Sequence, residues 1–535
     1  MGLETLPGFS DSAAAKASVA LGALVIVFIG LYVVLYSLKY HNTANATLEE
    51  FLTARNSSGW IAIGWSMFAS AVGSWVILTP AQFGSFGGVI TVLTYGFATG
   101  IPILLTGYWG ANLREKFPDI LSFSDFAVKQ YGPVTQVCVV LLSLLNMAIF
   151  ATAEYTGVYT LYSDYVGLGD NALFIVVLLA ITTMSYTTYG GLKVSIITDK
   201  VQGIAAALIT VVAAIFLAAN FSQEKVNEGL SGNQTGTFEV NEFVTGAYEV
   251  GYATMFTLPL SLICATIFSE AWWARAWASA DEKALKKGAL FGALLTFVVV
   301  SFWGSVGVLV AWAGLPITDF NLVAFIPFTL GSTNSLVDSA IGVLILLLAT
   351  IMAEGVIDSL MNGLGASVNG ALEPYLEGKN SLLIGRIVVV IINIPMVAVS
   401  LKKVDLLQLF LLGNMTTICA FFPLFLGFFP KVDIFQRNLT DYLFPLNFLG
   451  TILIIGVYGS ANLGSFSDGL HFAFLGNIFY EYEYFLVALL GTVFLTTILM
   501  TIHEVITRVF GNGAAVEDDA KDKDAIDVEL DMSKE

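Results

Sequence analysis

Carboxylates inside apolar segments are the residues of this sequence best placed to do chemistry. Glu154, Glu354 and Asp358 lie within long apolar runs, and Glu270 lies near the end of another. A charge at membrane depth is costly, so such a group usually faces a cavity or a partner. Glu354 and Asp358 are four residues apart and would share one helix face, which predicts a bound proton or cation between them. The alternative is a set of buried polar residues satisfied by backbone or serine groups.

The elements that must position these carboxylates are helices that cross a membrane. Of the 535 residues, 56% are hydrophobic and 12% are charged, and the mean hydropathy is +0.80. A soluble globular chain has roughly 25% charged residues, so this composition argues against a water-soluble enzyme. About thirteen apolar runs approach or exceed the roughly 20 residues of a spanning helix. We therefore expect an all-α polytopic membrane protein with about 13 transmembrane helices, because lipid leaves backbone groups few other options.

Basic residues predict the orientation of these helices. If the amino terminus is outside, the odd-numbered connections hold most of the Lys and Arg residues, among them Arg114, Lys129, Lys200 and Arg275. Short loops rich in such residues stay in the cytoplasm. We therefore predict that the N-terminus is outside, that the C-terminus is inside, and that the protein is a multi-pass protein of the cell membrane.

Enzyme motifs are not apparent in the sequence. The three cysteines and three histidines are scattered, so no zinc framework or catalytic triad can be assembled from their spacing. Gly190-Gly191 lacks the lysine and hydroxyl that follow in a phosphate-binding loop. Much of the formal net charge of −18 lies in the acidic tail after Gly511. We expect no enzyme, no cofactor and no nucleic-acid partner, and leave a metal site open.

Two apolar runs are interrupted in comparable places. The run over 60–83 contains Gly73 and Pro80, and the run over 248–271, five spans later, contains Gly251 and Pro259. Two interrupted segments at corresponding positions indicate a transporter built from inverted five-helix repeats, with its site near the bilayer midplane. The alternative is that Gly and Pro are simply frequent in spanning helices.

Three motifs carry a resemblance to a known family. The first is Gly190-Gly191-Leu192 followed by Thr198-Asp199-Lys200-Val201-Gln202, the second is the Trp-rich segment that ends at Arg275, and the third is Asp358-Ser359-Leu360-Met361-Asn362 in the ninth apolar run. These motifs resemble those of the sodium:solute symporter family, although Ser269 and Glu270 depart from the family pattern. The resemblance implies a LeuT-like core with alternating access, in which the two interrupted helices break around the substrate.

This resemblance, with the apolar runs, predicts how the chain is divided. The predicted segments are 1–59 with the first transmembrane helix, 60–220 as the first five-helix repeat, 221–247 as an extracellular loop, 248–429 as the second repeat, 430–510 as two C-terminal helices, and 511–535 as an acidic disordered cytoplasmic tail.

The resemblance also implies a place for the coupling ion. Matched residue by residue, Ala69 and Val72 would offer backbone carbonyls, and a hydroxyl pair would fall at Gly355 and Val356, which have no side-chain oxygen. The sodium site is therefore expected to be degenerate. Asp199 matches the acidic residue on the family's inner cation route. The candidate coupling residues are Ala69, Val72, Asp199, Glu354, Gly355, Val356, Asp358 and Ser359. Loss of the hydroxyls beside gain of Glu354 favours H+ over Na+, although oxygens from serines such as Ser359 could rescue a sodium site.

A narrower resemblance concerns the substrate. Ser74-Trp75 and the Trp-rich inner segment look most like the urea active transporter branch, some members of which also carry polyamines. Aromatic rings beside a carboxylate would suit a small amide by hydrogen bonding, or an amine by charge and cation–π attraction. The candidate substrate-binding residues are Ala71, Ser74, Trp75, Glu154, Tyr155 and Tyr252.

These inferences together predict a secondary active symporter. It would move a small polar solute across the lipid bilayer by alternating access, driven by a proton or sodium gradient. A passive solute channel or a non-transporting nutrient sensor on the same fold remains the alternative, because the degenerate hydroxyl pair weakens the case for coupling.

Overall fold

A computed structural model describes residues 12–40, 47–220, 246–313, 317, 319–330, 335–372, 376, 378–429 and 432–510. Apart from residues 246 and 247, the predicted external loop over 221–247 lies outside these residues, and so does the predicted tail over 511–535. The orientation of the chain in the membrane and the predicted segment boundaries stay predictions.

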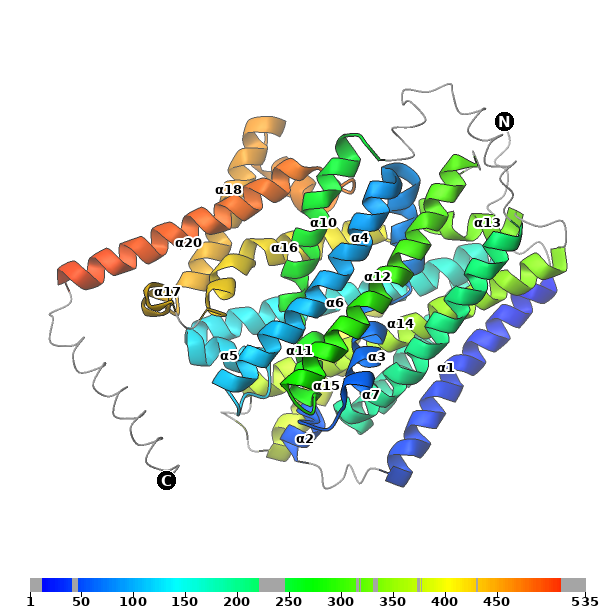
Figure 1. Cartoon of the computed structure of the whole chain (residues 1–535), viewed down its shortest axis with the longest axis horizontal. Coiled ribbons are helices and arrows are strands. Elements are labelled where there is room, and N and C mark those ends of the chain that lie inside the picture. Colours follow the sequence, from blue (N-terminus) through cyan, green and yellow to red (C-terminus); the bar gives the residue numbers. More distant parts are fainter. Residues whose placement is uncertain are drawn as a thin grey trace.

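The described part of the chain is built of helices (Figure 1). Their bounds are α1 Ser12–Tyr40, α2 Leu48–Thr53, α3 Trp60–Ala71, α4 Trp75–Lys116, α5 Phe123–Gln130, α6 Pro133–Thr160, α7 Leu173–Asn220, α10 Glu249–Ile267, α11 Glu270–Ala278, α12 Glu282–Trp312, α13 Ile326–Leu330, α14 Ser335–Leu372, α15 Gly378–Ser400, α16 Leu406–Leu426, α17 Asp433–Asn438, α18 Leu443–Leu463, α19 Phe466–His471 and α20 Tyr482–Phe510. Within the described residues, 12 helical segments are long and apolar enough to cross a membrane. The prediction of a polytopic helical protein is confirmed.

The difference between 12 segments and the expected 13 comes from α3 and α4. The α3 helix has only 12 residues, and Gly88 inside α4 has a non-helical conformation with φ +68°. Thr79 Oγ1 lies 2.9 Å from Tyr95 Oη, whereas residues 16 apart in a straight helix would be separated by about 24 Å. The chain therefore reverses at Gly88, so that α3 and the first half of α4 correspond to one broken apolar run.

A second reversal occurs inside α7. Gly191 has φ +63°, and a Cβ there would lie 2.6 Å from the backbone oxygen of Phe51. Only glycine combines this conformation with such close packing at no cost. Thr187 and Ser195, on opposite sides of Gly191, both donate hydrogen bonds to Asp358 of α14. The Gly-Gly motif thus turns the chain so that both halves of α7 face α14.

Small residues bring α4 and α12 into close contact, and Figure 1 shows the two helices side by side. A Cβ on Gly84 would lie 2.1 Å from the oxygen of Gly304, and a Cβ on Gly307 would lie 1.9 Å from the oxygen of Ala81. Small residues at such interfaces allow helix backbones in membranes to approach closely. The C-terminal helices α18 and α20, by contrast, lie at the edge of the bundle, and Leu490 of α20 is 57% exposed.

Candidate functional site

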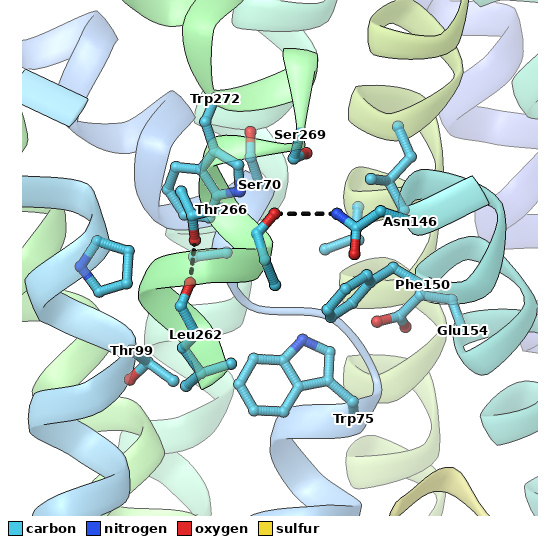
Figure 2. A pocket seen from close by; sticks show the side chains of 15 residues that line it. Ser70, Trp75, Thr99, Asn146, Phe150, Glu154, Leu262, Thr266, Ser269 and Trp272 are labelled. Carbon is cyan, nitrogen blue, oxygen red and sulfur yellow. Dashed lines mark hydrogen bonds between the residues drawn. The ribbon is translucent and has the colours of Figure 1, made fainter. Parts of the chain in front are cut away.

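Two helix breaks meet at one cavity of about 80 Å³. The first break lies at Val72–Ser74 between α3 and α4, and the second lies at Phe268–Ser269 between α10 and α11. The cavity is lined by Ser70, Ala71, Trp75, Thr99, Pro102, Asn146, Phe150, Glu154, Leu262, Ala265, Thr266, Ser269, Trp272, Val356 and Leu360. Figure 2 shows Trp75 on one side and Trp272 on the other. The predicted pair of interrupted helices therefore converges on a single pocket.

Glu154 of α6 reaches the first break. Its Oε2 accepts hydrogen bonds from the backbone nitrogen and the hydroxyl of Ser74, both at 2.7 Å, and its side chain is buried. A Cβ on Gly73 would lie 1.9 Å from Glu154 Oε1, so only glycine leaves room for the carboxylate. No Glu154 Oε1 hydrogen bond is found within the described residues. The first break thus contains a buried carboxylate, and one of its two oxygens is free to accept a hydrogen bond at the wall of the cavity.

Asn146, two turns before Glu154 on α6, forms a hydrogen bond with the backbone at the second break. Its Nδ2 donates to the backbone oxygen of Ala265 at 2.9 Å (Figure 2). A broken helix in lipid leaves carbonyl groups without their usual donors, and neighbouring side chains must satisfy them. The α6 helix therefore supplies hydrogen-bond partners for backbone groups at both breaks, through Glu154 at the first and Asn146 at the second.

The predicted substrate-binding residues are only partly brought together. Ala71, Trp75 and Glu154 line the cavity, and Ser74 lies beside it through its bonds to Glu154. Tyr155 is fully buried and donates to Asn393 Oδ1 at 3.0 Å, away from the cavity lining.

Tyr252, predicted to bind the substrate, does not line the cavity. Its side chain is 55% exposed, as is that of Met255 one turn later at 56%, so this face of α10 points out of the bundle. Apolar content and proximity to the break did not distinguish the outer from the inner face of that helix.

Arg275 and Asp199 form a buried ion pair that involves both broken helices. Arg275 of α11 donates from Nη2 to Asp199 Oδ2 of α7 at 2.8 Å, and both side chains are fully buried. Ser66 donates to the same Asp199 oxygen at 2.5 Å. Arg275 Nη2 also donates to the Ser359 hydroxyl at 2.6 Å. This cluster links α3, α7, α11 and α14, so the two broken helices share one charged anchor.

Breaking this ion pair is expected to be costly. Asp199→Asn leaves the Arg275 charge buried without a counter-charge, which destabilises a protein by about 3–5 kcal/mol, and it should slow cation-linked turnover. Asp164→Asn, which breaks the partly exposed pair with Lys403, should cost less than about 1 kcal/mol. Thermal unfolding of both purified variants in detergent measures the difference. Equal unfolding temperatures would show that Arg275 does not depend on Asp199.

Asp358 is fully engaged by its neighbours. It accepts hydrogen bonds from Thr187 at 2.7 Å, Ser195 at 2.7 Å, Thr198 at 3.3 Å and Asn362 at 3.0 Å. These donors satisfy a carboxylate that burial would otherwise leave uncompensated. The structure therefore gives Asp358 the alternative role considered for it, a buried carboxylate satisfied by hydroxyl groups that fixes both halves of α7.

Glu354, one turn before Asp358, has the opposite environment. It is fully buried, and neither carboxylate oxygen has a hydrogen-bond partner within the part of the chain that the structure describes. By geometry, the amide of Gln202 and the hydroxyl of Tyr186 likewise form no hydrogen bond with the described residues. Sequence analysis missed Gln202 and Tyr186 as site residues. Gln202 could have been found, because it ends the Thr-Asp-x-x-Gln motif.

Gly355 lies where the resemblance implies an ion. A Cβ on Gly355 would be 3.7 Å from the backbone oxygen of Ala69 and 3.0 Å from Gln202 Oε1. Val356 lines the cavity instead, and Val72 is the non-helical residue that ends α3. Ser359 is bonded to Arg275 and to Ser70, so these two hydroxyls already have partners. No group of three or more His, Cys, Asp or Glu side chains suited to a metal occurs within the described ranges.

Glu270 also has a defined place. It accepts from the backbone nitrogen of Phe123 at 2.7 Å and from Trp277 Nε1 at 3.3 Å, and the rings of Phe123 and Trp273 stack at 4.8 Å. This departure from the family motif therefore ties α11 to the start of α5.

Comparison with known proteins identifies what this architecture is similar to. The spermidine transporter DUR31 of Candida albicans is 24% identical over 484 residues, which is 89% of this chain and 88% of the relative. The urea active transporter of Saccharomyces cerevisiae is 23% identical over 291 residues, 51% of this chain and 38% of the relative. The chain is therefore similar, over most of its length, to a transporter of the kind that its sequence motifs resemble. No family model matches the chain.

A solved structure agrees with this relationship. A substrate-bound, outward-open Na+-coupled sialic acid symporter superposes with a TM-score of 0.66 at 17% identity, covering 91% of this chain and 98% of the symporter. The predicted LeuT-like fold is thereby confirmed. The 12 long apolar helical segments of the described residues make this a multi-pass membrane protein, and the relatives it matches are named as transporters rather than as enzymes.

Proposed function

We propose that this transporter is a symporter for a small amine or amide, such as a polyamine or urea, and that Glu154 recognises the substrate. The observation that carries the proposal is the position of Glu154, at the wall of the cavity where both helix breaks meet. Discontinuous helices at the midplane form the substrate site in transporters of this architecture. A carboxylate there favours a substrate that donates hydrogen bonds.

The lining of the cavity supports an amine in particular. Trp75 and Trp272 line it together with Glu154. An ammonium group is attracted both to a carboxylate and to the face of a tryptophan ring, and both attractions are stronger where water is excluded. An amide such as urea can donate to the same oxygen without carrying charge. The relatives named for spermidine and for urea fit these two substrate classes.

For coupling, we propose a proton carried by Glu354. A carboxylate without any hydrogen-bond partner is very costly to bury in its charged form, whereas the protonated form is far less so. The sodium:solute relationship supports coupling to a cation, and the solved neighbour is named as Na+-coupled. The lack of side-chain oxygens at Gly355 and Val356 favours H+ over Na+ for this chain.

The experiment is uptake of labelled putrescine and labelled urea into proteoliposomes that contain the purified protein. A proton gradient and a sodium gradient are imposed separately. Accumulation above the external concentration supports a symporter. Equilibration without accumulation would indicate a channel, and no saturable uptake or binding of either compound would remove both substrate classes.

A further inference from the structure

The side chain of Gln202 occupies a position that matters for ion selectivity. Ser195 and Thr198, in the second half of α7, donate to Asp358 of α14. Gln202 lies one turn after Thr198, and Glu354 lies one turn before Asp358, as expected for antiparallel helices in contact. The close approach of Gln202 Oε1 to the Cβ position of Gly355 confirms this register.

The end of Gln202 and the carbonyl of Ala69 both lie close to the Cβ position of Gly355. The Cβ position of Gly355 lies 3.0 Å from Gln202 Oε1 and 3.7 Å from the Ala69 oxygen. The resemblance implies a sodium ion held between the Ala69 carbonyl and a hydroxyl at position 355. With Gln202 in place, a hydroxyl-bearing side chain at 355 would meet the amide at a distance tighter than ordinary contact.

The serine hydroxyls beside this space are also poorly available to a sodium ion. The Ser359 hydroxyl accepts from Arg275 at 2.6 Å and lies 3.0 Å from the Ser70 hydroxyl. These serines could otherwise supply oxygen ligands. The Ser359 hydroxyl also donates to the backbone oxygen of Gly355 at 2.9 Å, so it would have to give up an existing hydrogen bond to hold a sodium ion.

We propose that Gln202 is the residue that excludes sodium from the space between α3 and α14. The amide of Gln202 lies against the position that a hydroxyl-bearing side chain at residue 355 would take, and its polar atoms have no hydrogen bond among the described residues. The link to proton coupling rests on the proposed function, but exclusion of sodium is a property of binding that can be measured without transport.

The test compares sodium binding by matched variants. The variant Gly355→Ser with Val356→Thr restores the hydroxyls but keeps Gln202. A second variant adds Gln202→Ala, which removes the 3.0 Å contact and leaves the Ala69 oxygen at ordinary distance. Thermal unfolding in detergent is followed while sodium chloride replaces potassium chloride at constant ionic strength. A ligand that binds only the folded state raises the unfolding temperature with its concentration.

Only the triple variant, Gly355→Ser with Val356→Thr and Gln202→Ala, is expected to be stabilised by sodium. The parent protein, the hydroxyl variant and Gln136→Ala, which changes a buried glutamine of α6, should be insensitive. Sodium stabilisation of the parent that Gln202→Ala alone removes would overturn the proposal, because Gln202 would then be a ligand. Insensitivity of the triple variant would overturn it too.

Two further readouts separate this inference from the proposed function. If the triple variant does not fold, Gly355→Ser with Gln202→Ala is measured, with stabilisation by sodium supporting the proposal and insensitivity overturning it. If a variant binds sodium but neither variant nor parent accumulates solute, exclusion by Gln202 stands and the proposed symport fails.

Discussion

Glu354→Gln is expected to abolish gradient-driven accumulation while leaving exchange of labelled for unlabelled substrate partly intact. Glutamine has the shape of the protonated acid but cannot release a proton, so the carrier would be held in its loaded form. A gradient of one pH unit supplies about 1.4 kcal/mol per proton, enough for about tenfold accumulation of a neutral solute. The variant should stop at equal concentrations on both sides.

The measurement is the ratio of internal to external substrate in proteoliposomes at steady state, with exchange measured in parallel. Glu504→Gln, on α20 outside the core, is the matched control and should accumulate substrate normally. Normal accumulation by Glu354→Gln would remove Glu354 from the mechanism. Loss of both accumulation and exchange would point to a folding defect and also contradict the proton-carrier role.

Glu154→Gln should weaken amine binding much more than amide binding. Hydrogen bonds to charged groups contribute about 1.5–3 kcal/mol, so removing the charge should lower affinity for putrescine by about 10- to 150-fold. Urea carries no charge, so its affinity should fall less: its own carbonyl oxygen can accept from the new amide nitrogen, which leaves the glutamine oxygen for Ser74. The Ser74 hydroxyl and backbone nitrogen, which donate to Glu154, can still donate to that oxygen.

Competition of unlabelled putrescine and urea against a bound label gives both affinities in one assay. The two substrates serve as controls for each other, because general damage to the pocket would weaken both equally. Equal losses would therefore contradict the role of the Glu154 charge. Unchanged putrescine affinity would place the substrate elsewhere.

The fold was largely predictable because apolar runs and their interruptions follow directly from the bilayer. Gly73 and the Gly190-Gly191 pair marked a break and a turn that the structure confirms. The apolar run over 60–83 also ends close to the reversal at Gly88, so the two spans that meet there were counted separately. The merging of two spans across Gly88 shows that a single glycine can turn the chain without a loop.

The site was less predictable, since it depends on which helix faces meet. Glu354 and Asp358 looked alike in sequence, yet α7 supplies hydroxyl donors to Asp358 and none to Glu354. Tyr252 was misplaced because α10 is apolar on its outer face as well as its inner face. Gln202 acquires its position only when α7 folds back on α14, a long-range contact that local spacing does not contain.

Proton-driven accumulation is the measurement that tests the central claim most directly. Proteoliposomes holding the purified protein are given labelled putrescine or urea under an imposed proton gradient, and a protonophore is then added. We predict accumulation that the proton gradient alone sustains and that the protonophore discharges. Accumulation driven only by sodium would contradict proton coupling, and equilibration unaffected by either gradient would contradict symport itself.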